Sequence, residues 1–166
     1  VNPTSNSKKE PFMKKALWIA LVTVSFLAFG TAESRAHCQI PCGIYDDAAR
    51  FASIREHLTT IEKSMVQINQ LSSDRENANL NQLVRWVENK DDHADQLTEI
   101  VTYYFMAQRV KPTNTDDTAA YAAYVEQVTA LHQMVVFAMK CKQTADLSNV
   151  QALQVLLTKF EKLYNQ

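Results

Sequence analysis

Residues 51–68 read FASIREHLTTIEKSMVQI, and their apolar side chains recur at alternating steps of three and four. Such steps place side chains on one face of an α-helix, which completes a turn every ~3.6 residues. The segment therefore predicts a helix whose single apolar stripe packs against other helices. The stripe consists of Phe51, Ile54, Leu58, Ile61, Met65 and Ile68.

A second stripe follows, with Lys90 at one position where an apolar residue is expected. Ser73-Asp-Arg-Glu76 has the form of a capping box, in which Ser73 and Glu76 satisfy free amide groups, so we expect this helix to begin there. Pro112 cannot continue it. The apolar positions are Leu80, Leu83, Val87, Ala94, Leu97, Val101 and Tyr104.

Two further stripes complete the pattern. Cap residues at 113–117 precede the third, and Lys140 and Lys142 suit its C-terminus. Asp146 or Ser148 can cap the fourth. The third stripe consists of Tyr121, Tyr124, Val128, Leu131, Val135 and Ala138, and the fourth of Val150, Leu153, Leu157, Phe160 and Tyr164.

Four stripes with short links predict an all-α fold, an antiparallel up-and-down four-helix bundle over residues 46–166. The composition agrees, because 2 Gly and 4 Pro among 166 residues supply few of the tight turns that hairpin-rich sheets need. Cys141 has no partner in its sequence neighbourhood, so we expect a buried free thiol.

Residues 1–36 have the pattern of a secretory signal. Two lysines precede an apolar run at 16–30 (ALWIALVTVSFLAFG), and small side chains follow at Ser34 and Ala36. We expect cleavage before His37, which implies an exported protein, periplasmic or secreted. A membrane anchor is the alternative, but the run is shorter than the ~20 residues that span a bilayer, so no membrane association is expected after cleavage.

The charges exclude one class of partner. The chain has 17 Lys+Arg and 18 Asp+Glu, and without residues 1–36 it keeps 12 and 16, a net charge of −4. There is no basic cluster in the body of the chain, and nucleic-acid binding needs one. We therefore expect no nucleic-acid partner.

Several catalytic chemistries are excluded by their motifs. A di-iron bundle needs Glu three residues before His on two helices, but Ile, Lys and Thr stand three residues before His57, His93 and His132. The sequence also contains no Gly-rich phosphate loop, HExxH, GxSxG or CxxCH.

The chemistry-bearing residues gather at 37–45, HCQIPCGIY, directly behind the expected cut. A free His37 amine and the Cys38 amide nitrogen can close one chelate ring, and that amide with the Cys38 thiolate can close a second. The chain then folds back at Pro41 and Gly43 to bring the Cys42 thiolate in. Residues 37–45 therefore form a candidate metal-binding hook.

Two nitrogens and two sulfurs in flat chelate rings favour a square-planar metal, Ni(II) or Cu(II), over tetrahedral Zn. The His37 imidazole can add as an axial ligand. Thiolates and an anionic amide donate strongly and stabilise the higher oxidation state, so a metal held in this way is a candidate redox catalyst.

HCxxPCGxY at a processed N-terminus, followed by four helices, resembles the nickel-containing superoxide dismutases. The resemblance implies a nickel ion held by His37, Cys38 and Cys42, with the His37 imidazole bound in the oxidised state. It also implies the reaction 2 O2•− + 2 H+ → O2 + H2O2, with superoxide as substrate and nickel cycling between Ni(III) and Ni(II). Family members are homohexamers, so a hexamer is expected.

The same resemblance assigns catalytic roles to two tyrosines. Tyr45 matches a tyrosine that stands over the open axial face and limits access to small anions. Tyr104 matches a second tyrosine near the site or, alternatively, is a core aromatic. In relatives an acid and a basic residue orient the axial imidazole, and Ala52 and His93 occupy those places here. His93 is thus a candidate partner of the imidazole or, alternatively, a surface residue in a polar run.

Two other interpretations remain open from the residues alone. Exported proteins meet oxidising surroundings, where Cys38 and Cys42 can form a structural disulfide instead of a thiolate pair. The protein can also be an exported helical bundle that binds a metal or a partner without turning over a substrate.

Overall fold

The computed structural model describes residues 44–73 and 79–165, which lie within one compact unit, Cys38–Gln166. The predicted signal sequence and hook residues 37–43 lie outside the described residues. The helices are α2 (Asp47–Ser73), α3 (Leu80–Glu99), α4 (Thr118–Gln143) and α5 (Leu147–Tyr164), with a π-helix, η1 (Ile100–Arg109), continuing α3.

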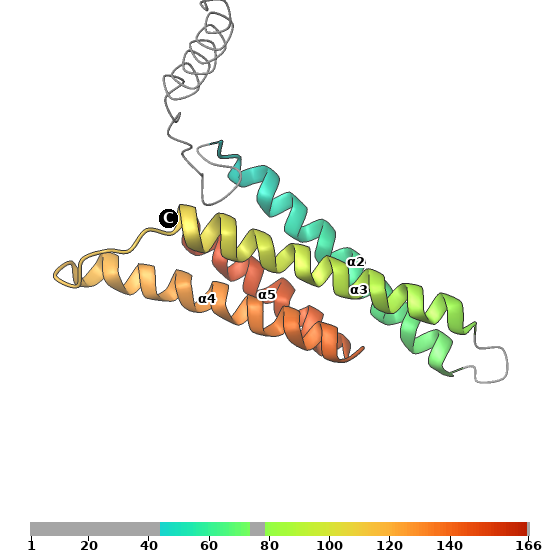
Figure 1. Cartoon of the computed structure of the whole chain (residues 1–166). Helices are drawn as coiled ribbons and strands as arrows, with labels where there is room; N and C mark the ends of the chain where they lie inside the picture. Colours follow the sequence, from blue (N-terminus) through green and yellow to red (C-terminus); the bar gives the residue numbers. More distant parts are fainter. Residues whose placement is uncertain (1–43, 74–78, 166) are drawn as a thin grey trace, which may run out of the picture. The chain divides into compact units, whose positions relative to one another are not determined.

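Successive helices run in opposite directions (Figure 1). Each helix packs against the next one along the chain, and α5 returns to pack against α2. The start of α2 and the ends of η1 and α5 therefore lie at the same end of the bundle. The all-α antiparallel bundle predicted from the stripes is confirmed.

Most residues of the predicted stripes form the core, but the prediction is wrong for Leu80, Val87 and Tyr121, which are exposed; Leu80 and Tyr121 lie in the first turns of their helices. All six apolar residues of the first stripe are buried in α2, and the stripe of α5 is buried from Val150 to Phe160. Full burial of a Val, Leu, Ile, Phe or Met side chain contributes roughly 1.5–3 kcal/mol to the stability of the fold. The aliphatic residues that are completely inaccessible to solvent include Ile54, Ile61, Leu97, Leu131, Val150 and Leu153.

The predicted start of the second helix is wrong. Ser73 is the last residue of α2, and its hydroxyl donates back to the Gln70 carbonyl at 2.7 Å instead of capping a new helix. The cap of α3 is Asn79, whose side chain accepts a hydrogen bond from the Gln82 amide at 3.2 Å. A serine satisfies a preceding carbonyl as readily as a following amide, so the motif alone did not distinguish the two ends.

The other predicted caps are confirmed. Asp117 accepts a hydrogen bond from the Ala120 amide at the start of α4. Asp146 accepts one from the Ser148 amide at the start of α5. These carboxylates satisfy free amides and complement the helix dipole.

The π-helix η1 was not predicted by the sequence pattern. Its i→i+5 hydrogen bonding shows at its end, where the Val110 amide donates to the Phe105 carbonyl at 2.8 Å. Tyr104 and Phe105 face the core from η1. The helix ends at Arg109, shortly before Pro112, as the proline requires.

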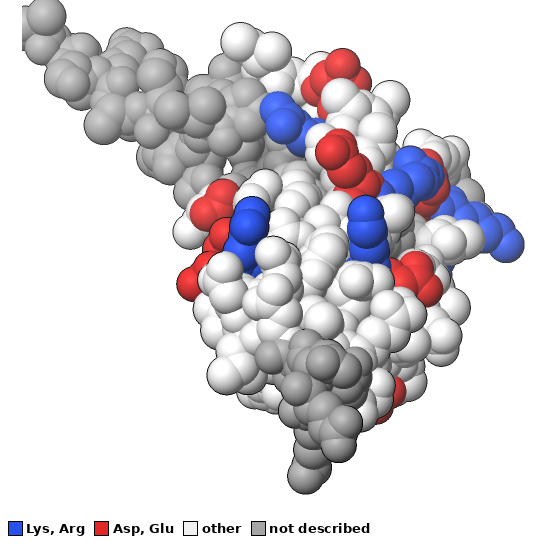
Figure 2. Space-filling view, turned by 90° about the vertical axis from the view of Figure 1, so that its right-hand side faces the viewer, with Lys and Arg blue, Asp and Glu red and all other residues white. Residues whose placement is uncertain are grey.

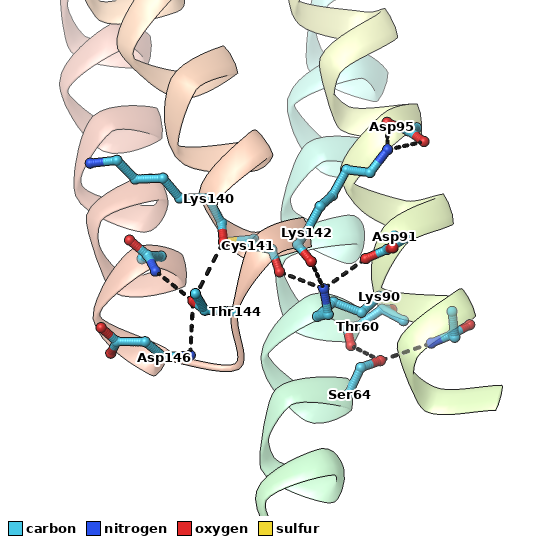
Figure 3. Close-up of polar contacts among 12 residues, drawn as sticks. Thr60, Ser64, Lys90, Asp91, Asp95, Lys140, Cys141, Lys142, Thr144 and Asp146 are labelled. Atoms are coloured by element: carbon cyan, nitrogen blue, oxygen red, sulfur yellow. Dashed lines mark hydrogen bonds and ion pairs between the residues drawn. The ribbon is translucent and has the colours of Figure 1, made fainter. Parts of the chain in front are cut away.

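Lys90 is the unexpected polar residue of the second stripe, and it is only 2% exposed. Its ammonium donates to the carbonyls of Cys141 and Lys142, at 2.6 and 2.8 Å, and to Asp91 at 2.6 Å (Figure 3). These carbonyls lie in the last turn of α4, where they lack partners within the helix. Lys90 therefore ties α3 to the C-terminal end of α4.

Cys141 is a buried free cysteine, as predicted. Burial raises the pKa of its thiol to about 11, although the nearby Lys90 acts in the opposite direction. The thiolate form, which reacts with oxidants and metals, is therefore scarce at neutral pH.

The surface mixes charges of both signs. On the face that Figure 2 shows, basic and acidic side chains lie beside one another around an uncharged area. No helix within the described residues combines the length and apolar character needed to cross a membrane.

Candidate active site

Tyr45 and Tyr104 lie together at the start of α2. Tyr45 precedes the helix and is 45% exposed, whereas Tyr104 comes from η1 and is 2% exposed. Their rings meet edge to face with centroids 6.0 Å apart. The structure therefore brings together the two residues predicted to be catalytic, while His37, Cys38 and Cys42 lie outside the described residues.

The Asp47 carboxylate, in the first turn of α2, receives hydrogen bonds from three side chains. Arg109 donates through Nε and Nη2 at 2.8 and 2.6 Å, a bidentate arrangement that matches the guanidinium fork to the carboxylate. The hydroxyls of Tyr104 and Tyr164 donate at 2.6 and 2.9 Å. We call Asp47, Arg109, Tyr104 and Tyr164 the Asp47 cluster.

The hydrogen bonds of the cluster fix its protonation states. Those from Arg109, more than any other contact, lower the pKa of Asp47 to about 2. Burial, and then the hydrogen bond to Asp47, raise the pKa of Tyr104 to about 12. The pKa of Tyr164 is raised for the same reasons. At neutral pH Tyr104 is therefore a protonated phenol whose hydrogen is directed at a carboxylate.

Two arginines stack on the two tyrosines. The Cζ atom of Arg109 lies 4.5 Å from the centroid of the Tyr45 ring, and that of Arg50 lies 5.3 Å from the centroid of the Tyr104 ring. Each guanidinium is within the ~6 Å at which a cation is attracted to the face of an aromatic ring. The Nε of Arg50 is buried and has no hydrogen-bond partner among the described residues.

A family model of nickel-containing superoxide dismutases matches residues 32–166 of the chain, which include the predicted hook and the whole bundle. The chain belongs to this family. No curated protein and no solved structure matches it. As a nickel-containing superoxide dismutase, it converts superoxide to O2 and H2O2 with nickel as its cofactor.

The predicted donors for nickel are those of the hook, and His37, Cys38 and Cys42 lie outside the described residues. Between residues 44 and 73 and between 79 and 165, no three His, Cys, Asp or Glu side chains group so that they could hold a metal ion. The His37 amine, the Cys38 amide and the thiolates of Cys38 and Cys42 would form an N2S2 set if the prediction holds. Such soft, strongly donating ligands suit nickel.

His93, the predicted partner of the axial imidazole, contacts His57. Their Nδ1 atoms lie 2.8 Å apart, between α3 and α2, and both side chains are half-buried. Burial, and then the neighbouring His93, lower the pKa of His57. His57 lies ten residues beyond Asp47 on α2, about 15 Å along the helix axis. The role of His93 in the dismutase stays a prediction, and Ala52 is exposed on α2.

Sequence reasoning missed the roles of Asp47, Arg50 and Arg109, and it assigned Tyr164 only to the core stripe. Arg109 and Tyr164 come from parts of the chain 62 and 117 residues from Asp47. The one local signal is a charged side chain at the end of the apolar segment 100–109, and it does not reveal the partner.

We expect Asp47 to make the stability of this dismutase depend on pH. Its pKa is about 2 in the fold and 3.8 for a free aspartate side chain, so the contribution is complete above the unfolded pKa and lost as pH falls through the folded one. Between pH 6 and 3 the free energy of unfolding should fall by about 1 kcal/mol, and solvent screening of the partly exposed Asp47 side chain makes this loss smaller. Urea unfolding of wild type and Asp47→Asn at both pH values should show a smaller pH-dependent loss in the variant.

Asp95→Asn is the control for this measurement. Asp95 pairs with Lys142 on the surface, where the Asp95 side chain is 59% exposed. If the free energy of unfolding changes as much between pH 6 and 3 in Asp47→Asn as in wild type, Asp47 is not the source of the pH dependence.

Proposed function

We propose that the dismutation takes place at a processed N-terminus that begins with His37, in a chain that is exported across a membrane. The packing of Tyr45 against Tyr104 carries the proposal. This packing places both predicted catalytic residues at the start of α2, and Tyr45 follows Cys42 by three residues in the sequence. Two further observations support it: the signal pattern ends before His37, and the family match covers the hook.

In the proposed site nickel is held by the amine and imidazole of His37, the amide and thiolate of Cys38, and the thiolate of Cys42. An extended chain advances at most ~3.6 Å per residue, so the Cα atoms of Cys42 and Tyr45 are no more than about 11 Å apart. The tyrosine pair therefore lies within reach of the hook.

Bound nickel supplies a one-electron cycle between Ni(III) and Ni(II). The reaction also consumes two protons for each H2O2, and the two tyrosines differ in what they can deliver. The Tyr104 hydroxyl donates its hydrogen to Asp47, so it presents only oxygen lone pairs to the site. We therefore assign proton delivery to the exposed phenol of Tyr45, which also limits access to small anions.

We further propose that the protein assembles as a homohexamer, by resemblance to the family. Exposed apolar side chains support an interface on α3, where Leu80 and Val84 are 70% and 54% exposed and lie one turn apart. Contiguous exposed apolar surface commonly marks a contact between proteins. Light scattering on the processed, nickel-loaded protein tests the assembly, and a monomer mass would contradict it.

One added residue before His37 should abolish nickel uptake and dismutase activity. The added residue converts the terminal amine into an amide and removes the first chelate ring, while the helices keep their cores. Nickel content by elemental analysis, turnover by pulse radiolysis and helicity by circular dichroism should be measured on one sample whose N-terminus mass spectrometry has defined.

The matched control carries the same added residue after Gln166 and should retain both nickel and turnover. Full activity of the N-terminally extended chain would exclude the amine as a ligand, and with it the proposed processing.

A further inference from the structure

Arg109 connects the start of α2 to the ends of η1 and α5. Its guanidinium binds both oxygens of Asp47, donates to the Tyr164 hydroxyl at 3.0 Å, and stacks over the Tyr45 ring. The Arg109 and Asp47 side chains are 29% and 27% exposed. The pair is therefore shielded from solvent and stronger than an ion pair on the open surface.

The π-helix is what brings Arg109 to this place. In an α-helix, where each residue turns ~100°, Tyr104 and Arg109 would point about 140° apart. In η1 the hydrogen bonds join residues five apart, as from Val110 to Phe105, so residues five apart lie nearly one above the other. Both side chains consequently reach Asp47. Helices of this kind are rare and occur frequently at functional sites.

Tyr45 depends on side-chain contacts for its position. It precedes α2, so no helical turn surrounds it, and nearly half of its surface is exposed. Among the described residues, the contacts that orient its ring are the guanidinium of Arg109 on its face and the edge contact with Tyr104. Asp47 in turn fixes both Arg109 and the Tyr104 hydroxyl.

We propose that Arg109 is a positioning residue of the dismutase, which holds the Tyr45 ring over the substrate path and, through Asp47, orients the Tyr104 hydroxyl. The inference rests on the proposed function, because it places the nickel hook next to Tyr45. Lysine cannot replace arginine here, since it has neither the planar fork for Asp47 nor the flat surface for stacking.

The test compares Arg109→Met and Arg109→Lys in the processed, nickel-loaded protein. Both variants should keep wild-type nickel content, and turnover per nickel should fall at least about 10-fold, because misplacing a positioned group by ~1 Å can cost about 100-fold. Arg55→Met is the control, because Arg55 is a half-exposed surface residue paired with Glu161. Turnover per nickel that is unchanged in both Arg109 variants would reduce Arg109 to a structural role and overturn the proposal.

A second readout does not require activity. In the nickel-free protein, NMR contacts between the Tyr45 and Tyr104 rings should be present in wild type and Arg55→Met and lost in both Arg109 variants. Ring contacts that persist in the Arg109 variants would overturn the proposal. This readout also applies if the turnover assay fails.

A coupling measurement separates the action of Arg109 through the two tyrosines from a general effect on the protein. In a background that carries Tyr45→Leu and Tyr104→Phe, the further change Arg109→Met should lower turnover less than about 2-fold, because the ring and the hydroxyl that Arg109 positions are both already absent. Two losses that multiply would contradict the proposal. The proposed function fails by a different result, namely turnover that survives removal of the hook thiolates.

Discussion

Cys42→Ser loses nickel and dismutase activity together, and this is the largest effect that we expect. Metal binding at this position needs a thiolate, and a serine hydroxyl is neither ionised at neutral pH nor a soft donor. Neither Ile44 nor Tyr45, the two hook residues that the structure describes, belongs to the hydrophobic core, so helicity and the urea midpoint should stay near those of wild type. Cys38→Ser should give the same result, because it removes the other thiolate.

Cys141→Ala is the matched control, since it removes the third thiol of the chain from inside the bundle. It should cost some stability and leave nickel content unchanged. A Cys42→Ser protein with normal turnover would show that the hook is not the site. A thiol count on the metal-free protein completes the test, because three reactive thiols in denaturant fit the thiolate pair and one fits a disulfide between Cys38 and Cys42.

Lys90→Ala lowers the free energy of unfolding by about 3 kcal/mol, the largest effect on stability that we expect. The change leaves carbonyls of Cys141 and Lys142 without their donor in a buried place, which costs ~1–3 kcal/mol for each unsatisfied group. It also removes the buried part of a long side chain and leaves a cavity. Urea unfolding followed by circular dichroism measures the difference.

Lys142→Ala is the control for charge alone. Lys142 pairs with Asp95 on the surface, with side chains 36% and 59% exposed, and such pairs contribute ~1 kcal/mol or less. Lys90→Met adds a second comparison, because it keeps most of the buried chain and loses only the donor, so its effect should lie between the other two. Equal losses for Lys90→Ala and Lys142→Ala would contradict the role of Lys90 as the link to α4.

The bundle could be predicted because the apolar residues of each helix recur at regular steps along the sequence. The six-residue stripe of α2 is buried without exception, and Asp117 and Asp146 cap the helices that they precede. The prediction failed where the same residue type fits two local structures, as Ser73 does at a helix end. It also failed at η1, because a 3.6-residue pattern carries no sign of a change to i→i+5 hydrogen bonds.

The candidate site also has a part that the sequence predicts and a part that it does not. The hook is a contiguous motif, so its donors are visible in the sequence, and the resemblance supplied Tyr45 and Tyr104. Asp47 and Arg109 are 62 residues apart, and their pairing depends on the π-helical geometry of η1. The hook motif and the resemblance therefore predicted the chemistry of the site, but no pattern in the sequence indicated the residues that hold its tyrosines.

The Asp47 cluster joins the first turn of the first described helix to the last residue of the final one, because the Tyr164 hydroxyl donates to Asp47. A nascent chain that has not yet released Tyr164 from the ribosome lacks that contact, however well its earlier helices have formed. Completion of the surroundings of Tyr45 is thus linked to the synthesis of α5. Chains truncated within α5 cannot build this end of the bundle, whatever they contain at their N-terminus.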